Sequence, residues 1–215
     1  MGYRAEGFEQ DGIYHIFTRG VEKRNIFLDY NDRIRFKLLL LHCLPNKFIL
    51  SFSHAQKLKQ KPELSSNGSG LVDILCYCLM DNHIHLLLRE NVEGGITKYM
   101  QRILNSYAKY FNVRHDRTGV LFGGRFKSVP VISDEQLLHV SRYIHLNPSE
   151  AKITKNPFAY HWSSLGQYIG ESKEEYSHPD FILNIMNGGY REFVLDHIDY
   201  EQTCAAYPEL LIDDE

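Results

Sequence analysis

The sequence has few cysteines and no long apolar run, and both features limit the classes of protein that it can encode. Four cysteines stand among 215 residues, without CxxC spacing or the density of a secreted disulfide scaffold. The N-terminal stretch MGYRAEGFEQDG contains no apolar signal core, and no segment reaches the roughly 20 apolar residues of a membrane span. We therefore expect a soluble cytoplasmic protein with no membrane partner, whose cysteines are ordinary buried thiols.

Basic residues are scarce in the C-terminal part of the chain. Residues 166–215 hold 2 Lys and Arg against 12 Asp and Glu, whereas residues 1–165 hold 22 against 15. The net charge of −3 therefore combines a basic body with an acidic tail, and such a body can still bind phosphate groups. We predict a main domain at 1–165 and an acidic appendage at 166–215. The appendage has helical apolar spacing, and its charge would also let it compete with nucleic acid for the basic body.

Hydrophobic periodicity and turn residues predict alternating strands and helices. Strands are expected at 13–20, 71–80, 83–90 and 125–133, with the second and third joined as a hairpin through Asp81 and Asn82. Helices are expected at 30–44, which ends before Pro45, and at 95–115, and from Ser133 to about Asn147, because Pro148 follows. Residues 51–70 are expected to form a long flexible loop. This order predicts an α+β sandwich with a mainly antiparallel sheet and helices on one face.

Two histidines within DNHIHLLLRE are candidates for metal binding. His83 and His85 share a face of the predicted strand, since alternate side chains point the same way. Two imidazoles at this spacing can hold one divalent ion, but surface or core histidines fit the pattern too, so a third ligand is needed. Tyr143 and Asn147 stand four residues apart on the last predicted helix and could reach the same metal. A packed aromatic and a helix C-cap are their simpler interpretations, and the pattern alone favours these.

A basic and aromatic segment, RTGVLFGGRFKS, indicates contact with nucleic acid. Its glycines, rings and cations suit phosphate binding and base stacking, although a solvated basic face is the other interpretation. The candidate DNA-binding residues are Arg114, Arg117, Arg125 and Lys127.

Five segments in a fixed order resemble the single-tyrosine HUH transposases (transposase IS200-like), and among these the REP-associated tyrosine transposases. They cover about residues 13–165 and read YHIFTRG, CLMDNHIHLLL, SYAKYFNVRHDRTGVLFGGRFKS, RYIHLNPSEA and HWSS. The resemblance implies a ferredoxin-like catalytic domain that cleaves and rejoins single-stranded or hairpin DNA through a covalent 5′-phosphotyrosine intermediate. It implies that Tyr143 is the nucleophile and that His83, His85 and Asn147 hold Mg²⁺ or Mn²⁺, with no nucleotide cofactor.

Two departures from the family pattern affect the expected site. Asp81 stands where relatives often have Pro, and it could add a carboxylate near the metal or simply make the turn. After Pro148 the chain reads SEAKI instead of a more basic continuation, which weakens the expectation of DNA contact there. A domesticated binder of structured nucleic acid that does not cut is the alternative function. The intact Tyr143 and histidine pair favour the enzyme, and monomer and homodimer both stay open.

Overall fold

The computed structural model describes residues 7–47, 50–59 and 68–196, and in this part of the chain four strands form one antiparallel sheet. The sheet order is β2-β3-β1-β4. The strands are β1 (Ile13–Arg19), β2 (Val72–Leu79), β3 (His83–Glu90) and β4 (Lys127–Val131). The three long helices are α1 (Tyr30–His42), α3 (Gly95–Arg114) and α4 (Asp134–Glu150). Apart from short helices, the order β1-α1-β2-β3-α3-β4 is that of a ferredoxin-like sandwich, so the predicted fold class is confirmed.

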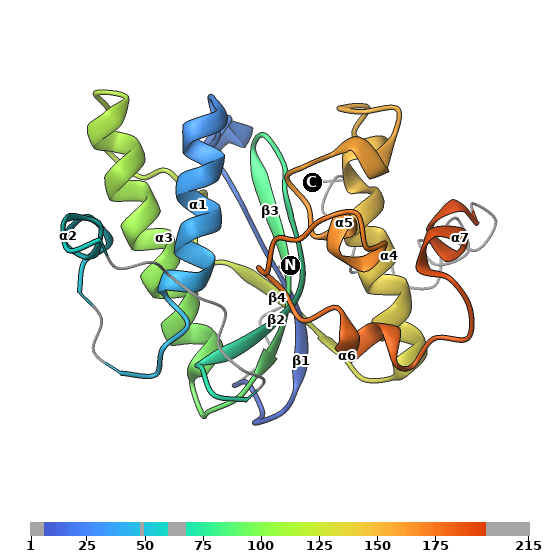
Figure 1. The fold of residues 1–215 in the computed structure, drawn as a ribbon. Coiled ribbons are helices and arrows are strands. Elements are labelled where there is room, and N and C mark those ends of the chain that lie inside the picture. Colours follow the sequence, from blue (N-terminus) through green and yellow to red (C-terminus); the bar gives the residue numbers. More distant parts are fainter. Residues whose placement is uncertain (1–6, 48–49, 60–67, 197–215) are drawn as a thin grey trace.

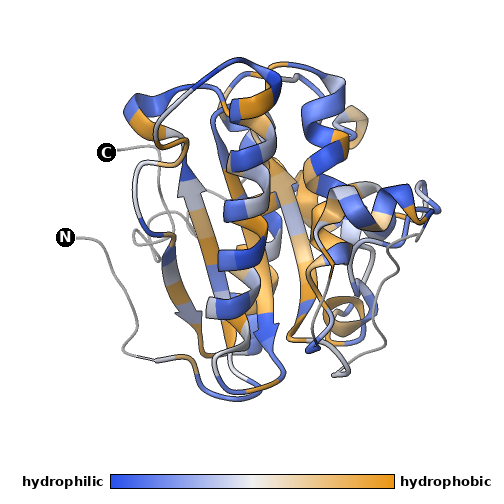
Figure 2. Ribbon diagram, turned by 90° about the vertical axis from the view of Figure 1, so that its left-hand side faces the viewer, coloured by the Kyte–Doolittle hydropathy of each residue, from blue (hydrophilic) through white to orange (hydrophobic). Residues whose placement is uncertain are grey.

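Helices cover both faces of the sheet, which corrects the expectation that they share one face. Figure 1 shows the sheet between a layer with α1 and α3 and a second layer with α4. On β3, Ile84 and Leu86 belong to the core under α1 and α3, whereas Leu87 belongs to the core under α4. Because residues of both parities are apolar, only a sheet that is covered twice buries them all. Seen from the α1 and α3 side, the helix in front is largely hydrophilic and the strands behind it are largely hydrophobic (Figure 2).

Two local predictions are wrong, the end of one helix and the absence of a helix from a predicted loop. The helix α4 runs on through Pro148 to Glu150, and the Ala151 N–H donates to the Asn147 carbonyl oxygen at 2.9 Å. Pro148 has no backbone N–H group and so donates no helical hydrogen bond, but the helix continues past it for two residues. The predicted loop at 51–70 contains the short helix α2 (Phe52–Lys57), because its Phe52 side chain is buried in the core under α1 and α3. Residues 60–67 of that loop lie outside the described residues.

The described part of the predicted acidic appendage packs against α4. It contains α5 (Leu165–Tyr168), α6 (Asp180–Leu183) and α7 (Tyr190–Leu195), which carry buried apolar side chains into the core under α4. The fully buried Arg142 donates to the carbonyl oxygens of Phe193 at 3.2 Å and Asp196 at 3.3 Å. Residues 197–215 lie outside the described residues, and competition between the tail and DNA stays a prediction.

Short 3₁₀ helices complete the described secondary structure, at Val21–Lys23 and Pro157–Ala159. In the described ranges, none of the helices combines the length and the apolar character needed to cross a bilayer.

Candidate active site

The sheet face beneath α4 carries the histidine pair. His83 and His85 point to this face, as strand alternation predicts, and their ring centroids lie 4.9 Å apart. His83 is 3% exposed and His85 is fully buried. The hairpin that places them turns at Asp81 and Asn82, as the sequence predicts.

The helix α4 places Tyr143 against these rings. Its start is fixed by the predicted N-cap, since the Ser133 hydroxyl oxygen accepts from the Gln136 N–H at 3.1 Å. The rings of Tyr143 and His85 meet edge to face, with centroids 5.7 Å apart and planes at 84°. Asn147 lies one turn further along α4 and is 1% exposed. The structure therefore gathers a phenol and two imidazoles between α4 and the sheet, with a buried carboxamide on the same helix.

A third histidine, His15 on β1, belongs to the same cluster and was missed in the sequence. Its ring stacks on His85 with centroids 5.1 Å apart, and its Nε2 lies 2.9 Å from the Nδ1 atom of His85. In the antiparallel register Phe17 stands opposite His85, so His15 is its diagonal neighbour, within side-chain reach. The motif YHIFTRG contains His15, but only the pairing of β1 with β3 shows which residue it contacts.

Hydrogen bonds select the nitrogen that each imidazole could offer to a metal. The Nδ1–H group of His83 donates to the Asn82 Oδ1 atom at 2.6 Å, and the Asn82 Nδ2 group donates to the Lys23 carbonyl oxygen at 3.1 Å. The lone pair of His83 is therefore on Nε2. When His85 donates from Nδ1 to His15, its own lone pair is likewise on Nε2.

Burial keeps His85 neutral, which is the form that binds metals. Desolvation is the main cause that lowers the pKa of His85 well below its usual value, and the positive charge of Arg19 lowers it further. The Nε2 atom of His85 and the Oδ1 atom of Asn147 are buried without a hydrogen-bond partner among the described residues. The same residues contain no group of three or more His, Cys, Asp or Glu side chains suited to a metal. The donor set that fits is therefore two imidazoles and one amide oxygen, completed by water.

Asp81 makes the turn and does not join the histidines. Its carboxylate pairs with Arg33, and its carbonyl oxygen accepts from the Ile26 N–H at 2.8 Å. Tyr107 of α3 lies in the core under α1 and α3, where its hydroxyl donates to the Ile26 carbonyl oxygen at 2.5 Å. Tyr107 is thus on the opposite side of the sheet from Tyr143.

Two of the four predicted DNA-binding cations have structural partners. Arg114 forms ion pairs with Asp29 and Asp32, each at 2.6 Å, and so links the end of α3 to the start of α1. Arg117, just after α3, donates to the Oδ1 atom of Asn112 in the last turn of that helix at 2.6 Å. Their charges are therefore partly committed to the fold.

The other two cations lie nearer to open surface or to the histidine site. Arg125 is exposed, and within the described chain it makes no hydrogen bond or ion pair. Lys127 begins β4, and its ammonium nitrogen lies 6.0 Å from the ring centroid of Phe17. Arg125 is therefore the candidate best placed to meet a phosphate, while Lys127 lies beside the histidine face.

Comparison with known proteins connects this site to a family. Residues 47–147 match the family model described as transposase IS200 like. A REP-associated tyrosine transposase bound to a REP hairpin is a similar solved structure, with 12% identity and a TM-score of 0.56. That match covers 83% of this chain and 90% of the other, and at such low identity it shows a shared fold. No curated protein sequence matches the chain significantly. The family resemblance that the motifs predict is confirmed over residues 47–147, and this matched stretch contains the histidine pair, Tyr143 and Asn147.

Proposed function

We propose that this protein cleaves and rejoins single-stranded or hairpin DNA through a covalent 5′-phosphotyrosine at Tyr143. The observation that carries the proposal is the packing of Tyr143 against the neutral, buried His85 at a ring-centroid distance of 5.7 Å. The match of residues 47–147 to a transposase family model supports DNA as the substrate. The similar solved transposase binds a REP hairpin, which supports hairpin-containing DNA for this chain as well.

The chemistry follows from the groups that the fold brings together. The Tyr143 hydroxyl group gives up its proton as its oxygen attacks the phosphorus, the bond from phosphorus to the 3′ oxygen breaks, and the 3′ oxygen takes up a proton and leaves as a 3′-hydroxyl group. The new phosphodiester keeps the energy of the old one, so a 3′-hydroxyl can reverse the step and rejoin a strand without a nucleotide cofactor.

His83, His85 and Asn147 would hold a divalent cation, Mg²⁺ or Mn²⁺, through two imidazole nitrogens and an amide oxygen. A free phenol has a pKa near ~10 and attacks phosphate slowly, so the reaction needs help with the charge that develops. When bound, the cation would supply charge stabilisation at the phosphoryl oxygens worth several kcal/mol. Tyr143 is only 3% exposed, so a phosphate reaches its hydroxyl group only after the side chain or α4 moves.

An adduct assay with a labelled hairpin oligonucleotide tests the proposal. In the presence of Mn²⁺, DNA labelled at its 3′ end should migrate with denatured protein, because the 5′-phosphotyrosine retains the downstream fragment. DNA labelled at its 5′ end should be released, and a chelator should prevent the adduct.

Tyr143→Phe should lose the adduct and keep DNA binding, because it removes only the attacking oxygen. Tyr110→Phe is the matched control, since Tyr110 lies on α3 in the other layer. An adduct that survives in Tyr143→Phe would refute the assignment. Binding without any adduct in the unmodified protein would support the non-cleaving alternative.

A further inference from the structure

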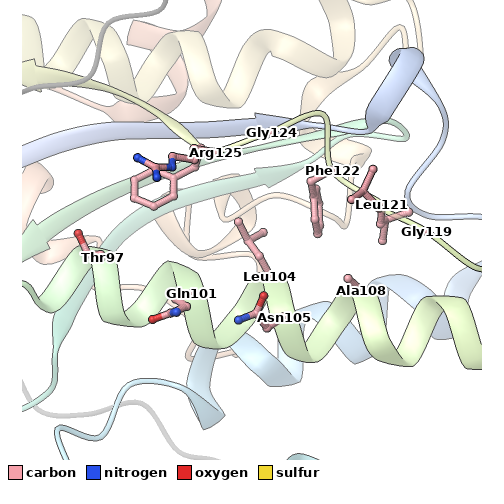
Figure 3. A pocket seen from close by; sticks show the side chains of 12 residues that line it. Thr97, Gln101, Leu104, Asn105, Ala108, Gly119, Leu121, Phe122, Gly124 and Arg125 are labelled. Carbon is pink, nitrogen blue, oxygen red and sulfur yellow. The ribbon is translucent and has the colours of Figure 1, made fainter.

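A cleft of about 500 Å³ lies between α3 and the segment 119–126 that leads into β4 (Figure 3). On one wall, α3 presents the polar side chains of Gln101 and Asn105, one helical turn apart. On the other wall stand Phe122, Arg125 and Phe126. This cleft is in the α1 and α3 layer, whereas the histidine site lies under α4.

The wall formed by residues 119–126 is held in place by hydrogen bonds to its backbone. Gly119 and Gly124 have positive φ angles, 85° and 145°, which residues other than glycine rarely adopt. The Asn112 Nδ2 group donates to the Gly119 carbonyl oxygen at 2.8 Å, and the Gly123 N–H donates to the Arg19 carbonyl oxygen at 2.9 Å. Arg19 pairs with His83 in the register of β1 and β3, so this wall is attached to the strand end beside the histidine site.

Three polar side chains that line the cleft do not stabilise the described part of the fold through polar contacts. Gln101, Asn105 and Arg125 are exposed, and within the described ranges none of them makes a hydrogen bond or ion pair. No acidic residue lines the cleft, while apolar side chains, among them two phenylalanines, make up much of its lining. A mostly apolar cleft with a few convergent polar groups is the usual form of a small-ligand site.

These groups match one nucleotide of a DNA strand. A carboxamide has a hydrogen-bond donor and an acceptor side by side, and these complement the N7 acceptor and N6 donor on the edge of adenine. A phenylalanine ring can stack on the face of a base. A guanidinium group binds a phosphate oxygen with a charge-assisted hydrogen bond. A concave site of this size accepts a base only when that base is unpaired.

We propose that this cleft binds an unpaired nucleotide of the substrate strand, with adenine preferred. Gln101 and Asn105 contact the base edge, a phenylalanine ring stacks on the base, and Arg125 binds the adjacent phosphate. The inference rests on the proposed function in one respect, that single-stranded DNA is the ligand. It adds a second contact region on the opposite side of the sheet from Tyr143.

Binding of short single-stranded probes tests the site without cleavage. Full-length protein with Tyr143→Phe is titrated with fluorescent octanucleotides that are thymidine throughout or carry adenine at the central positions, and anisotropy gives each Kd. Loss of a good base contact corresponds to roughly 5- to 150-fold in affinity. We expect the added Gln101→Ala and Asn105→Ala substitutions to weaken adenine probes by at least about fivefold and to abolish the adenine preference. Arg125→Ala should weaken all probes alike.

Asn184→Ala is the matched control, because Asn184 is an exposed amide in the α4 layer whose side chain makes no hydrogen bond within the described chain. It should leave every Kd unchanged. Equal thermal unfolding temperatures show that each variant is folded. If the double variant binds all probes as its parent does, the cleft is not a nucleotide site.

The adduct assay separates this inference from the proposed function. A chain that forms the Tyr143 adduct but binds probes independently of Gln101 and Asn105 overturns the cleft alone. A chain that prefers adenine through these amides but never forms an adduct overturns the cleavage proposal and leaves the cleft intact.

Discussion

Replacing His15 by alanine should weaken the binding of a divalent metal while leaving the proposed ligands in place. His15 is fully buried, stacks on His85 at 10° between the ring planes, and hydrogen-bonds its Nδ1 atom at 2.9 Å. Without this partner the His85 ring loses both the contact that sets its tautomer and the surface that sets its orientation. Removing such a partner of a metal-binding histidine costs about 10- to 100-fold in metal affinity, or about 1.4–2.7 kcal/mol.

His145→Ala is the matched control for the loss of a buried histidine. His145 is also fully buried, and its ring nitrogens lie 2.8 Å from the hydroxyl oxygens of Tyr190 and Ser164. Burial lowers the pKa of both His15 and His145 to about 3, so both rings are neutral near pH 7. Each substitution should therefore lower the unfolding free energy by a similar amount, roughly 1–3 kcal/mol, but only His15→Ala removes a contact to His85.

The assay measures Mn²⁺ in two ways, by calorimetric titration and by the Mn²⁺ concentration that gives half-maximal adduct formation. Both midpoints should rise about 10- to 100-fold in His15→Ala and stay unchanged in His145→Ala. The reasoning is refuted when the Mn²⁺ midpoints of His15→Ala equal those of the unmodified protein. It is also refuted when the midpoints rise equally in His15→Ala and His145→Ala.

Three further predictions concern stability, DNA binding and thiol chemistry. Glu90 is fully buried and accepts from the Gly94 N–H at 2.8 Å and the Ile96 N–H at 2.9 Å, so Glu90→Ala should lower the unfolding free energy in urea by roughly 2–4 kcal/mol. An unchanged urea midpoint would contradict this role at the start of α3. Arg125→Ala should reduce the salt slope of DNA binding by about 1, whereas Arg114→Ala should change it little because Asp29 and Asp32 balance that charge; equal reductions would exclude this distinction. Burial raises the pKa of the Cys43 thiol to about 12, so at pH 8 only ~10⁻⁴ of it is thiolate, and Cys43 should react with an aromatic disulfide reagent only after unfolding. Mass spectrometry of the labelled peptides checks this, and rapid labelling of Cys43 in the native protein would disprove it.

Local features of the sequence determined most of the secondary structure and the residue types at the proposed catalytic site. Strand alternation was enough to place His83 and His85 on one face, because side-chain direction in a strand depends only on parity. The start of α4 followed from Ser133 and Gln136, since a helix cap involves residues a few positions apart. The family motifs then connected these positions to Tyr143 and Asn147.

The tertiary structure alone decided which distant residues meet these groups. His15 reaches His85 because β1 and β3 pair in one particular register, and no local pattern specifies the partner of a strand. Arg114 was predicted to bind DNA, but the packing of α1 on α3 brings two carboxylates to its guanidinium group. The sequence also did not show that α4 covers the second face of the sheet, because an apolar strand does not indicate which helix packs on each of its faces. Such contacts join segments that are far apart along the chain, so their energies act only once the whole sheet has formed.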